Sequence, residues 1–199
     1  MVILASASPR RKELLGGMGI DFAVKVSKVD ESIVSKEVPP PLYVQELAFI
    51  KAAAVAKVCD DSDAVVISAD TIVVNDDEIL GKPNDEADAK RMLGALSGKT
   101  HQVYTGYCVM RVRDMYTVCK SVCTNVTFKE LGVDKIAKYT ATGEPMDKAG
   151  AYGIQGYGAM LIERIEGDYF NVVGLPVSSL ADTLEEDFGF ELFDGDCGR

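Results

Sequence analysis

Asp70 is the one charged residue in a mostly apolar run, residues 64–74. A run of this length predicts a strand that is buried on both faces. Because an ionised carboxylate is costly to bury alone, Asp70 needs a partner, a metal ion or a solvated cleft. The residue is therefore either the polar end of a strand that caps a turn, or a carboxylate that serves as a metal ligand or general base.

Positive charges gather at the start of a predicted helix. Ser8 suits its N-cap and Pro9 its first position, but Arg10, Arg11 and Lys12 place three cations in the first turn. The helix dipole favours anions there. A bound phosphate would remove this penalty, because helix N–H groups and guanidinium groups would converge on one anion. The alternative is a solvated basic turn.

Other charged residues also admit two interpretations. Lys51 falls within the apolar stripe of a helix predicted over residues 42–58, so its amine either snorkels to solvent or faces a buried anion. Lys82 lies on a stiff loop between Gly81 and Pro83. Glu31 lies in an acidic stretch that is either a plain loop or the source of a second carboxylate for a cation.

A glycine-rich segment, residues 143–158, contains Lys148 and Gln155. Its five glycines predict a tightly folded loop with positive φ angles, whose amides can approach a ligand. A flexible linker would be richer in serine and poorer in Tyr, Ile and Met. We therefore expect an ordered loop.

Strands and helices alternate along the rest of the chain, which predicts an α/β fold. Short strands are expected over residues 1–5, 22–26 and 79–80, and helices over residues 8–15, 86–96 and 134–140. One β-hairpin is expected over residues 100–112 and 116–128, and another over residues 160–165 and 169–173. A last helix begins near residues 175–176.

Composition excludes several classes of protein. The net charge of −10 over 199 residues argues against a nucleic-acid-binding surface. His101 is the only histidine and has no nearby Ser or Cys motif, which disfavours a Ser-His or Cys-His hydrolase. Five cysteines without a CxxC motif predict reduced thiols. No signal peptide or membrane span is evident, so we expect a cytoplasmic protein.

Five stretches in register resemble the Maf family of nucleoside triphosphate pyrophosphatases, also called septum-formation inhibitor-like proteins. They are residues 5–15, 68–71, 81–83, 147–156 and 171–176. The resemblance covers residues 1–190, expected to be a single domain with two lobes around one cleft. It leaves residues 191–199 as a tail without assigned function.

The resemblance implies a fold like that of inosine triphosphate pyrophosphatases: a long, twisted mixed sheet with helices, and substrate in the cleft between the lobes. It also implies hydrolysis of a nucleoside triphosphate to the monophosphate and pyrophosphate, assisted by a divalent cation (Mg, Mn or Co). Asp70 matches the catalytic acid. The implied phosphate-binding residues are Ser8, Arg11, Lys51, Lys82 and Lys148, and the implied metal ligands are Glu31 and Asp70.

Three positions favour one branch of the family. Within the resemblance, this chain has Arg10, Thr71 and Gln155 at three positions. The branch of the family that acts on 7-methyl-GTP carries Trp, Gln and Glu at these positions. A cationic methylated guanine favours an aromatic face and a carboxylate, whereas an amide can match the carbonyls and N–H of a neutral pyrimidine. We therefore expect a house-cleaning enzyme acting on dTTP, UTP and related pyrimidine nucleotides.

Two alternatives remain: a nucleotide-binding regulator of cell division and septum formation, and a purine (ITP/XTP) pyrophosphatase on the same fold. The expected partner is a small-molecule nucleoside triphosphate, without nucleic acid or membrane, and a homodimer is compatible with the sequence. If the lysines form one phosphate site, removing these mutually repelling charges should leave the stability of the ligand-free protein unchanged or raised.

Overall fold

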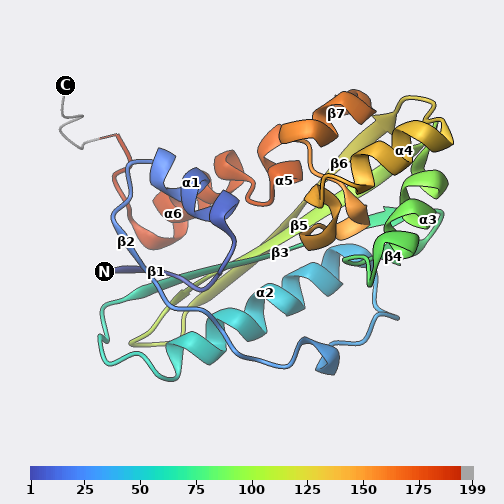
Figure 1. Cartoon of the computed structure of the whole chain (residues 1–199). Helices are drawn as coiled ribbons and strands as arrows, with labels where there is room; N and C mark the ends of the chain where they lie inside the picture. The colour runs from blue at the N-terminus through green and yellow to red at the C-terminus, as the bar shows by residue number, and fades with distance from the viewer. Residues whose placement is uncertain (194–199) are drawn as a thin grey trace. The chain divides into compact units, whose positions relative to one another are not determined.

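A mixed β-sheet organises the chain in the computed structural model, which describes residues 1–193 (Figure 1). Its strands in this part of the chain are β1 (Val2–Leu4), β2 (Phe22–Val24), β3 (Val65–Asn75), β4 (Glu78–Leu80), β5 (Thr100–Arg111), β6 (Thr117–Phe128) and β7 (Ile162–Glu166). Their order is β2-β1-β3-β5-β6-β7, with β4 paired to β3. β1 is parallel to β2 and β3, whereas the β3–β4 and β6–β7 pairs are antiparallel.

Helices occupy much of the chain between the strands. They are α1 (Pro9–Gly17), α2 (Pro40–Ala56), α3 (Glu86–Leu96), α4 (Val133–Thr140), α5 (Tyr169–Val173) and α6 (Val177–Phe188). Short 3-10 helices are η1 (Glu31–Ile33), η2 (Glu144–Asp147), η3 (Ala149–Ala151) and η4 (Gly156–Leu161). Within residues 1–193, none of the helices has the length and apolar character needed to cross a membrane. The expected α/β fold with a mixed sheet and helices is confirmed.

The chain divides into two units. Unit 1 consists of Met1–Asp70, Thr105–Val122 and the described part of Gly174–Arg199, and unit 2 consists of Thr71–Tyr104 and Cys123–Val173. The long strands β3, β5 and β6 contribute residues to both units. Of the tail predicted over residues 191–199, residues 194–199 lie outside the described residues.

The alternation of β3 decides which side chains face which helix in unit 1, since successive residues of a strand point to opposite faces. The odd-numbered Val65 and Ile67 pack in a buried cluster with Leu180 of α6. The even-numbered Val66 packs in a second cluster with Ala52 of α2. Figure 1 shows α2 on one face of these strands and α1 and α6 on the other. Even-numbered residues further along β3 in this unit therefore face α2.

The core of unit 2 forms between its strands and helices α3 and α4. Leu93 of α3 and Ile136 of α4 are buried in one cluster with Phe128 of β6 and Tyr152 of the glycine-rich segment. The segment is ordered by η2, η3 and η4, and Gly143, Gly150 and Gly156 have positive φ angles. This confirms the expectation of an ordered, tightly folded loop.

Several predicted bounds differ from the structure by one or two residues, and one predicted element is wrong. α2 begins at Pro40, before the predicted residue 42, because proline is tolerated in the first helical turn. Residues 169–173 form the short helix α5, so the predicted second hairpin is wrong. Asp168 accepts a hydrogen bond from the Phe170 N–H (2.7 Å), and the Asn171 amide is buried against the Val103 carbonyl (3.0 Å). These tertiary contacts override the strand propensity of the aromatic and branched residues.

Candidate functional site

Asp70 lies at the end of the part of β3 that belongs to unit 1, on the strand face that α2 covers. Two residues earlier on the same face, the buried Ser68 donates its hydroxyl to the Ala48 carbonyl of α2 (2.5 Å). This bond fixes the helix against the strand one turn before Lys51. Ser68 is a positioning residue that the sequence analysis did not single out, although a serine two residues from Asp70 in an apolar run was the available signal.

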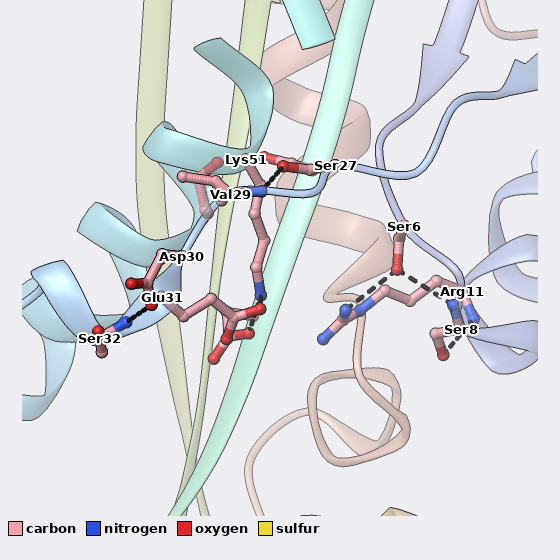
Figure 2. Close-up of polar contacts among 12 residues, drawn as sticks. Ser6, Ser8, Arg11, Ser27, Val29, Asp30, Glu31, Ser32 and Lys51 are labelled. Atoms are coloured by element: carbon pink, nitrogen blue, oxygen red, sulfur yellow. Dashed lines mark hydrogen bonds and ion pairs between the residues drawn. The ribbon is translucent and has the colours of Figure 1, made fainter. Parts of the chain in front are cut away.

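Lys51 connects two carboxylates within unit 1. Its Nζ lies 2.5 Å from Asp70 Oδ1 and 3.0 Å from Glu31 Oε1. The side chains of Lys51 and Asp70 are only 12% and 15% exposed, whereas that of Glu31 is 54% exposed. Figure 2 shows Lys51 reaching from α2 toward Glu31. The ammonium therefore faces one largely buried carboxylate, Asp70, and one exposed carboxylate, Glu31, so the interpretation in which Lys51 faces a buried anion fits better than the one in which its amine reaches solvent.

Local hydrogen bonds hold the segment that carries Glu31. Asp30 caps η1 by accepting a hydrogen bond from the Ser32 N–H (2.9 Å), and Ser27 accepts one from the Val29 N–H (3.3 Å) (Figure 2). Such Asx and Ser turns fix a loop without a regular ladder. Glu31 is thus the first residue of a capped turn and not part of an irregular acidic loop.

Arg11 is held at the start of α1. Ser8 is the N-cap and accepts a hydrogen bond from the Arg11 N–H (3.4 Å), as predicted. The Arg11 guanidinium donates to the Gly174 carbonyl (2.8 Å) and to Ser6 Oγ (3.2 Å), the latter visible in Figure 2. These bonds fix the guanidinium in place. Ser6 is a second positioning residue that the sequence analysis did not single out.

The Arg11 guanidinium interacts electrostatically with the carboxylates of Asp70 and Glu31. Burial lowers the pKa of Arg11, the negative charges of Asp70 and Glu31 raise it, and the positive charge of the half-buried Arg10 lowers it further. Burial followed by the charges of Asp70 and Glu31 also raises the pKa of Tyr43, a buried residue of α2. Tyr43 is a site neighbour without a sequence signal, because a tyrosine in the apolar stripe of a helix is ordinary core.

Unit 2 contains the other predicted site residues. Lys148 is held by the glycine-rich segment, since its Nζ donates to the Glu144 carbonyl and to Asp147 Oδ1, both at 2.6 Å. The exposed Lys82 follows Gly81, whose carbonyl accepts a hydrogen bond from the Gly150 N–H (3.0 Å). The loops that carry the two lysines are therefore joined. Thr71 is half-buried and Gln155 is exposed.

Glu144 organises the segment that carries Lys148 and Gln155. Its carboxylate accepts hydrogen bonds from the N–H groups of Tyr157 (3.0 Å) and Gly158 (2.9 Å) and from the Tyr139 hydroxyl (3.0 Å). Carboxylate hydrogen bonds of this kind are stronger than neutral ones. The sequence analysis missed this role, because two of the three partners of Glu144 are 13 and 14 residues away along the chain.

Glu31 and Asp70, the two residues expected to bind a metal ion, supply only part of a metal site. Within residues 1–193, no group of three or more His, Cys, Asp or Glu side chains is placed to hold a metal ion. Asp70 and Glu31 nevertheless direct their carboxylates to one point of positive charge, the Lys51 ammonium. Mg²⁺ commonly binds through one or two carboxylates together with substrate phosphates. The pair thus fits a divalent cation that a phosphate-bearing ligand would share.

The chain is similar over nearly its whole length to known proteins. The chain is 50% identical over 191 residues to a protein of Thermoanaerobacter sp. (strain X514) named dTTP/UTP pyrophosphatase, covering 96% of this chain and 98% of that one. It is 51% identical over 183 residues to a protein of the same name from Moorella thermoacetica, covering 92% and 93%.

A solved structure titled nucleoside-triphosphatase / dITP/XTP pyrophosphatase, from Mycobacterium abscessus, aligns with 94% of this chain and 93% of its own, at 13% identity and a TM-score of 0.42. The family model described as Maf-like protein matches residues 1–187. The chain therefore belongs to the Maf-like protein family.

Proposed function

We propose that the chain hydrolyses dTTP, UTP and related pyrimidine nucleoside triphosphates to the nucleoside monophosphate and pyrophosphate. The observation that carries the proposal is the Asp70 carboxylate, presented at the end of a buried strand segment and contacted by the Lys51 ammonium. The names of relatives about 50% identical over nearly the whole chain support the substrate class.

Asp70 is the proposed catalytic residue. Water attacks the α-phosphorus, the bond from that phosphorus to the α,β-bridging oxygen breaks, and pyrophosphate leaves. A carboxylate can orient the water and accept its proton. Catalysis of phosphoryl transfer rests mainly on such positioning and on stabilising charge. Asp70 suits this role because Ser68 fixes the helix that faces it.

Cations of unit 1 would stabilise the phosphates. A triphosphate carries about four negative charges, which an acidic protein must match with local cations. The Lys51 ammonium has three N–H donors, and the contacts with Asp70 and Glu31 account for two. Ser8 and Arg11 lie at the N-terminus of α1, where N–H groups and a fixed guanidinium favour an anion.

Glu31 and Asp70 are the residues that would hold a divalent cation, Mg, Mn or Co. Such an ion supplies charge neutralisation at the phosphates. Lys51 lies between the same two carboxylates, so we expect it to turn toward a phosphate when the ion and the nucleotide bind together. The exposure of Glu31 leaves that carboxylate accessible to such an ion.

In unit 2, we assign phosphate contacts to Lys82 and Lys148. Gln155, Thr71 and the unit 1 residue Arg10 are the proposed determinants of base specificity. Gln155 offers both a donor and an acceptor, which matches the N–H and the carbonyls of uracil or thymine. Its exposure and the fixed loop around it support this assignment.

A pyrophosphate-release assay over a panel of nucleotides tests the proposal. We expect dTTP and UTP to be hydrolysed with kcat/KM values well above those of ATP, GTP, ITP and 7-methyl-GTP, and activity to disappear in excess chelator and return with Mg²⁺, Mn²⁺ or Co²⁺. A panel led by ITP or 7-methyl-GTP would contradict the substrate assignment. Binding of nucleotides without release of pyrophosphate would instead favour a nucleotide-binding regulator.

A further inference from the structure

The hairpin of β5 and β6 keeps a single register. Near its turn, the Arg111 N–H donates to the Tyr116 carbonyl (2.9 Å), and near its open end the Phe128 N–H donates to the Lys99 carbonyl (2.9 Å). Between these two pairs both strands advance by the same number of residues, so the strands pair without a bulge between these points. Every residue in between therefore has a defined partner on the opposite strand.

This register places Cys108 directly opposite Cys119 within unit 1. Hydrogen-bonded and non-hydrogen-bonded pairs alternate along antiparallel strands. Because Arg111 and Tyr116 form a hydrogen-bonded pair, Cys108, three residues away, falls on a non-hydrogen-bonded pair. Opposite Cα atoms in such a pair are about 4.5 Å apart, within the roughly 4.4–6.8 Å that a disulfide spans.

The two thiols lie in contact under α2. Both belong to the cluster that packs against this helix, Cys108 fully buried and Cys119 partly exposed. The Cys108 thiol donates a hydrogen bond to the Cys119 sulfur, which raises the pKa of Cys108 and lowers that of Cys119. The more accessible thiol is therefore also the one whose thiolate is favoured, and a thiolate is the reactive form.

We propose that Cys108 and Cys119 form a site of reversible oxidation, at which a hydroperoxide converts the two thiols into a cross-strand disulfide. The Cys119 thiolate attacks one peroxide oxygen, the O–O bond breaks, and hydroxide leaves from hydrogen peroxide, which is reduced. The resulting sulfenic acid reacts with the Cys108 thiol, forming the S–S bond and releasing water. A dithiol reductant returns both thiols by exchange.

The other cysteines lack this arrangement. Cys123 is exposed on β6, and its thiol hydrogen-bonds with the Tyr104 hydroxyl and not with a second cysteine. Cys59 packs at the edge of the cluster beyond the end of α2. Cys197 lies outside the described residues. Cys123 is therefore the matched control: an exposed thiol on the same strand without a resolving partner.

The test oxidises the purified, fully reduced chain with hydrogen peroxide, blocks the remaining thiols with an alkylating reagent and maps the peptides without reduction. We expect the thiols of Cys108 and Cys119 to disappear together, a cross-linked peptide joining them, and full recovery in dithiothreitol. Cys119→Ser should abolish the cross-link and leave Cys108 reduced. Cys123→Ser should form the cross-link in the wild-type yield.

Several outcomes would overturn the proposal. One is a cross-link from Cys119 to Cys59 or Cys197 in place of Cys108. Another is oxidation of Cys123 while Cys119 stays reduced. A third is conversion of Cys119 to sulfinic acid without any cross-link. Because Cys119 is partly exposed, its serine variant should fold, and an unchanged melting temperature confirms that the lost cross-link is a chemical effect.

Discussion

Lys51 Nζ lies 2.5 Å from Asp70 Oδ1, which pairs the cation of α2 with the only charged residue of an otherwise uncharged strand segment. The pairing follows from the strand period: Asp70 has the same parity as Val66 and Ser68, which face α2. A register shift by one residue would turn the carboxylate to the other face. The contact therefore depends on the whole packing of unit 1.

Replacing Lys51 with methionine should destabilise the ligand-free protein. The variant keeps an apolar stem but leaves Asp70 and Glu31 without their shared ammonium. We expect the free energy of unfolding to fall by about 1–2 kcal/mol, within the range for hydrogen bonds to charged groups at a partly exposed site. Urea denaturation measures it. The sign is opposite to the expectation from sequence, which treated the lysines as repelling one another.

Lys90→Met is the control for this effect. Lys90 forms an exposed pair with Glu86 one helical turn away (3.5 Å), and its loss should cost no more than about 0.5 kcal/mol. If Lys51→Met has an unchanged or higher free energy of unfolding, the ion pairs with Asp70 and Glu31 do not stabilise the fold.

Lys82→Ala should weaken substrate binding without a cost in stability. The side chain is exposed, and no ion pair of Lys82 occurs among residues 1–193. We expect the KM for dTTP to rise while the melting temperature stays unchanged, because only a contact with the substrate is lost. Lys99→Ala, which removes an exposed lysine paired with Asp76 (2.9 Å), should leave KM unchanged. Equal KM values for dTTP in both variants would show that Lys82 does not contact the phosphates of the substrate.

Gln155→Glu should lower kcat/KM for dTTP and UTP, because a carboxylate would then face the carbonyl oxygens of the pyrimidine. Steady-state kinetics on dTTP, UTP and ATP measure the change. Gln102→Glu is the control, since Gln102 Oε1 accepts a hydrogen bond from the Tyr104 hydroxyl (3.0 Å) that glutamate can also accept. Unchanged pyrimidine kinetics in Gln155→Glu would show that this amide does not read the base.

His101 should make stability depend on pH in unit 2. It is buried, its Nε2 lies 2.7 Å from the Tyr152 hydroxyl, and its Nδ1 has no hydrogen-bond partner among residues 1–193. Burial lowers the pKa of His101 from 6.5 to about 4. Because this folded pKa is below the unfolded one, the unfolded chain binds the proton more readily, and stability is lost as the pH falls from 6.5 to about 4.

The comparison with His101→Gln isolates this effect from the carboxylates that titrate in the same range. The free energy of unfolding of the wild type, relative to the variant, should fall by about 2 kcal/mol between pH 7 and pH 4.5. Denaturation curves at a series of pH values measure it. Parallel pH dependence of the two proteins would show that His101 does not titrate with an altered pKa.

The sequence predicts the fold well wherever local signals agree. The helix expected over residues 86–96 coincides with α3, because Asp85 caps it through the Asp88 N–H (2.8 Å) and Ala89 and Leu93 recur at helical spacing. Ser8 likewise caps α1 as expected. Residues 169–173 were not predictable in this way, since their helix depends on contacts with distant residues.

The candidate site is predictable only in its composition. Sequence identifies Asp70 as a charge in an apolar strand and Lys51 as a charge in an apolar helix face, but not that they touch. That contact depends on how β3 and α2 pack, and Ser68 and Arg11 are held by carbonyls far along the chain, those of Ala48 and Gly174. Such partners leave no periodic or spacing signal.

Pyrophosphate release from dTTP by Asp70→Asn tests the central claim most directly. Asparagine keeps the size of the side chain but cannot accept the proton of the attacking water, so the rate should fall at least ~100-fold with a largely unchanged melting curve. Asp76→Asn, which alters an exposed aspartate paired with Lys99, should retain the wild-type rate. A folded Asp70→Asn variant that releases pyrophosphate at nearly the wild-type rate would contradict the account.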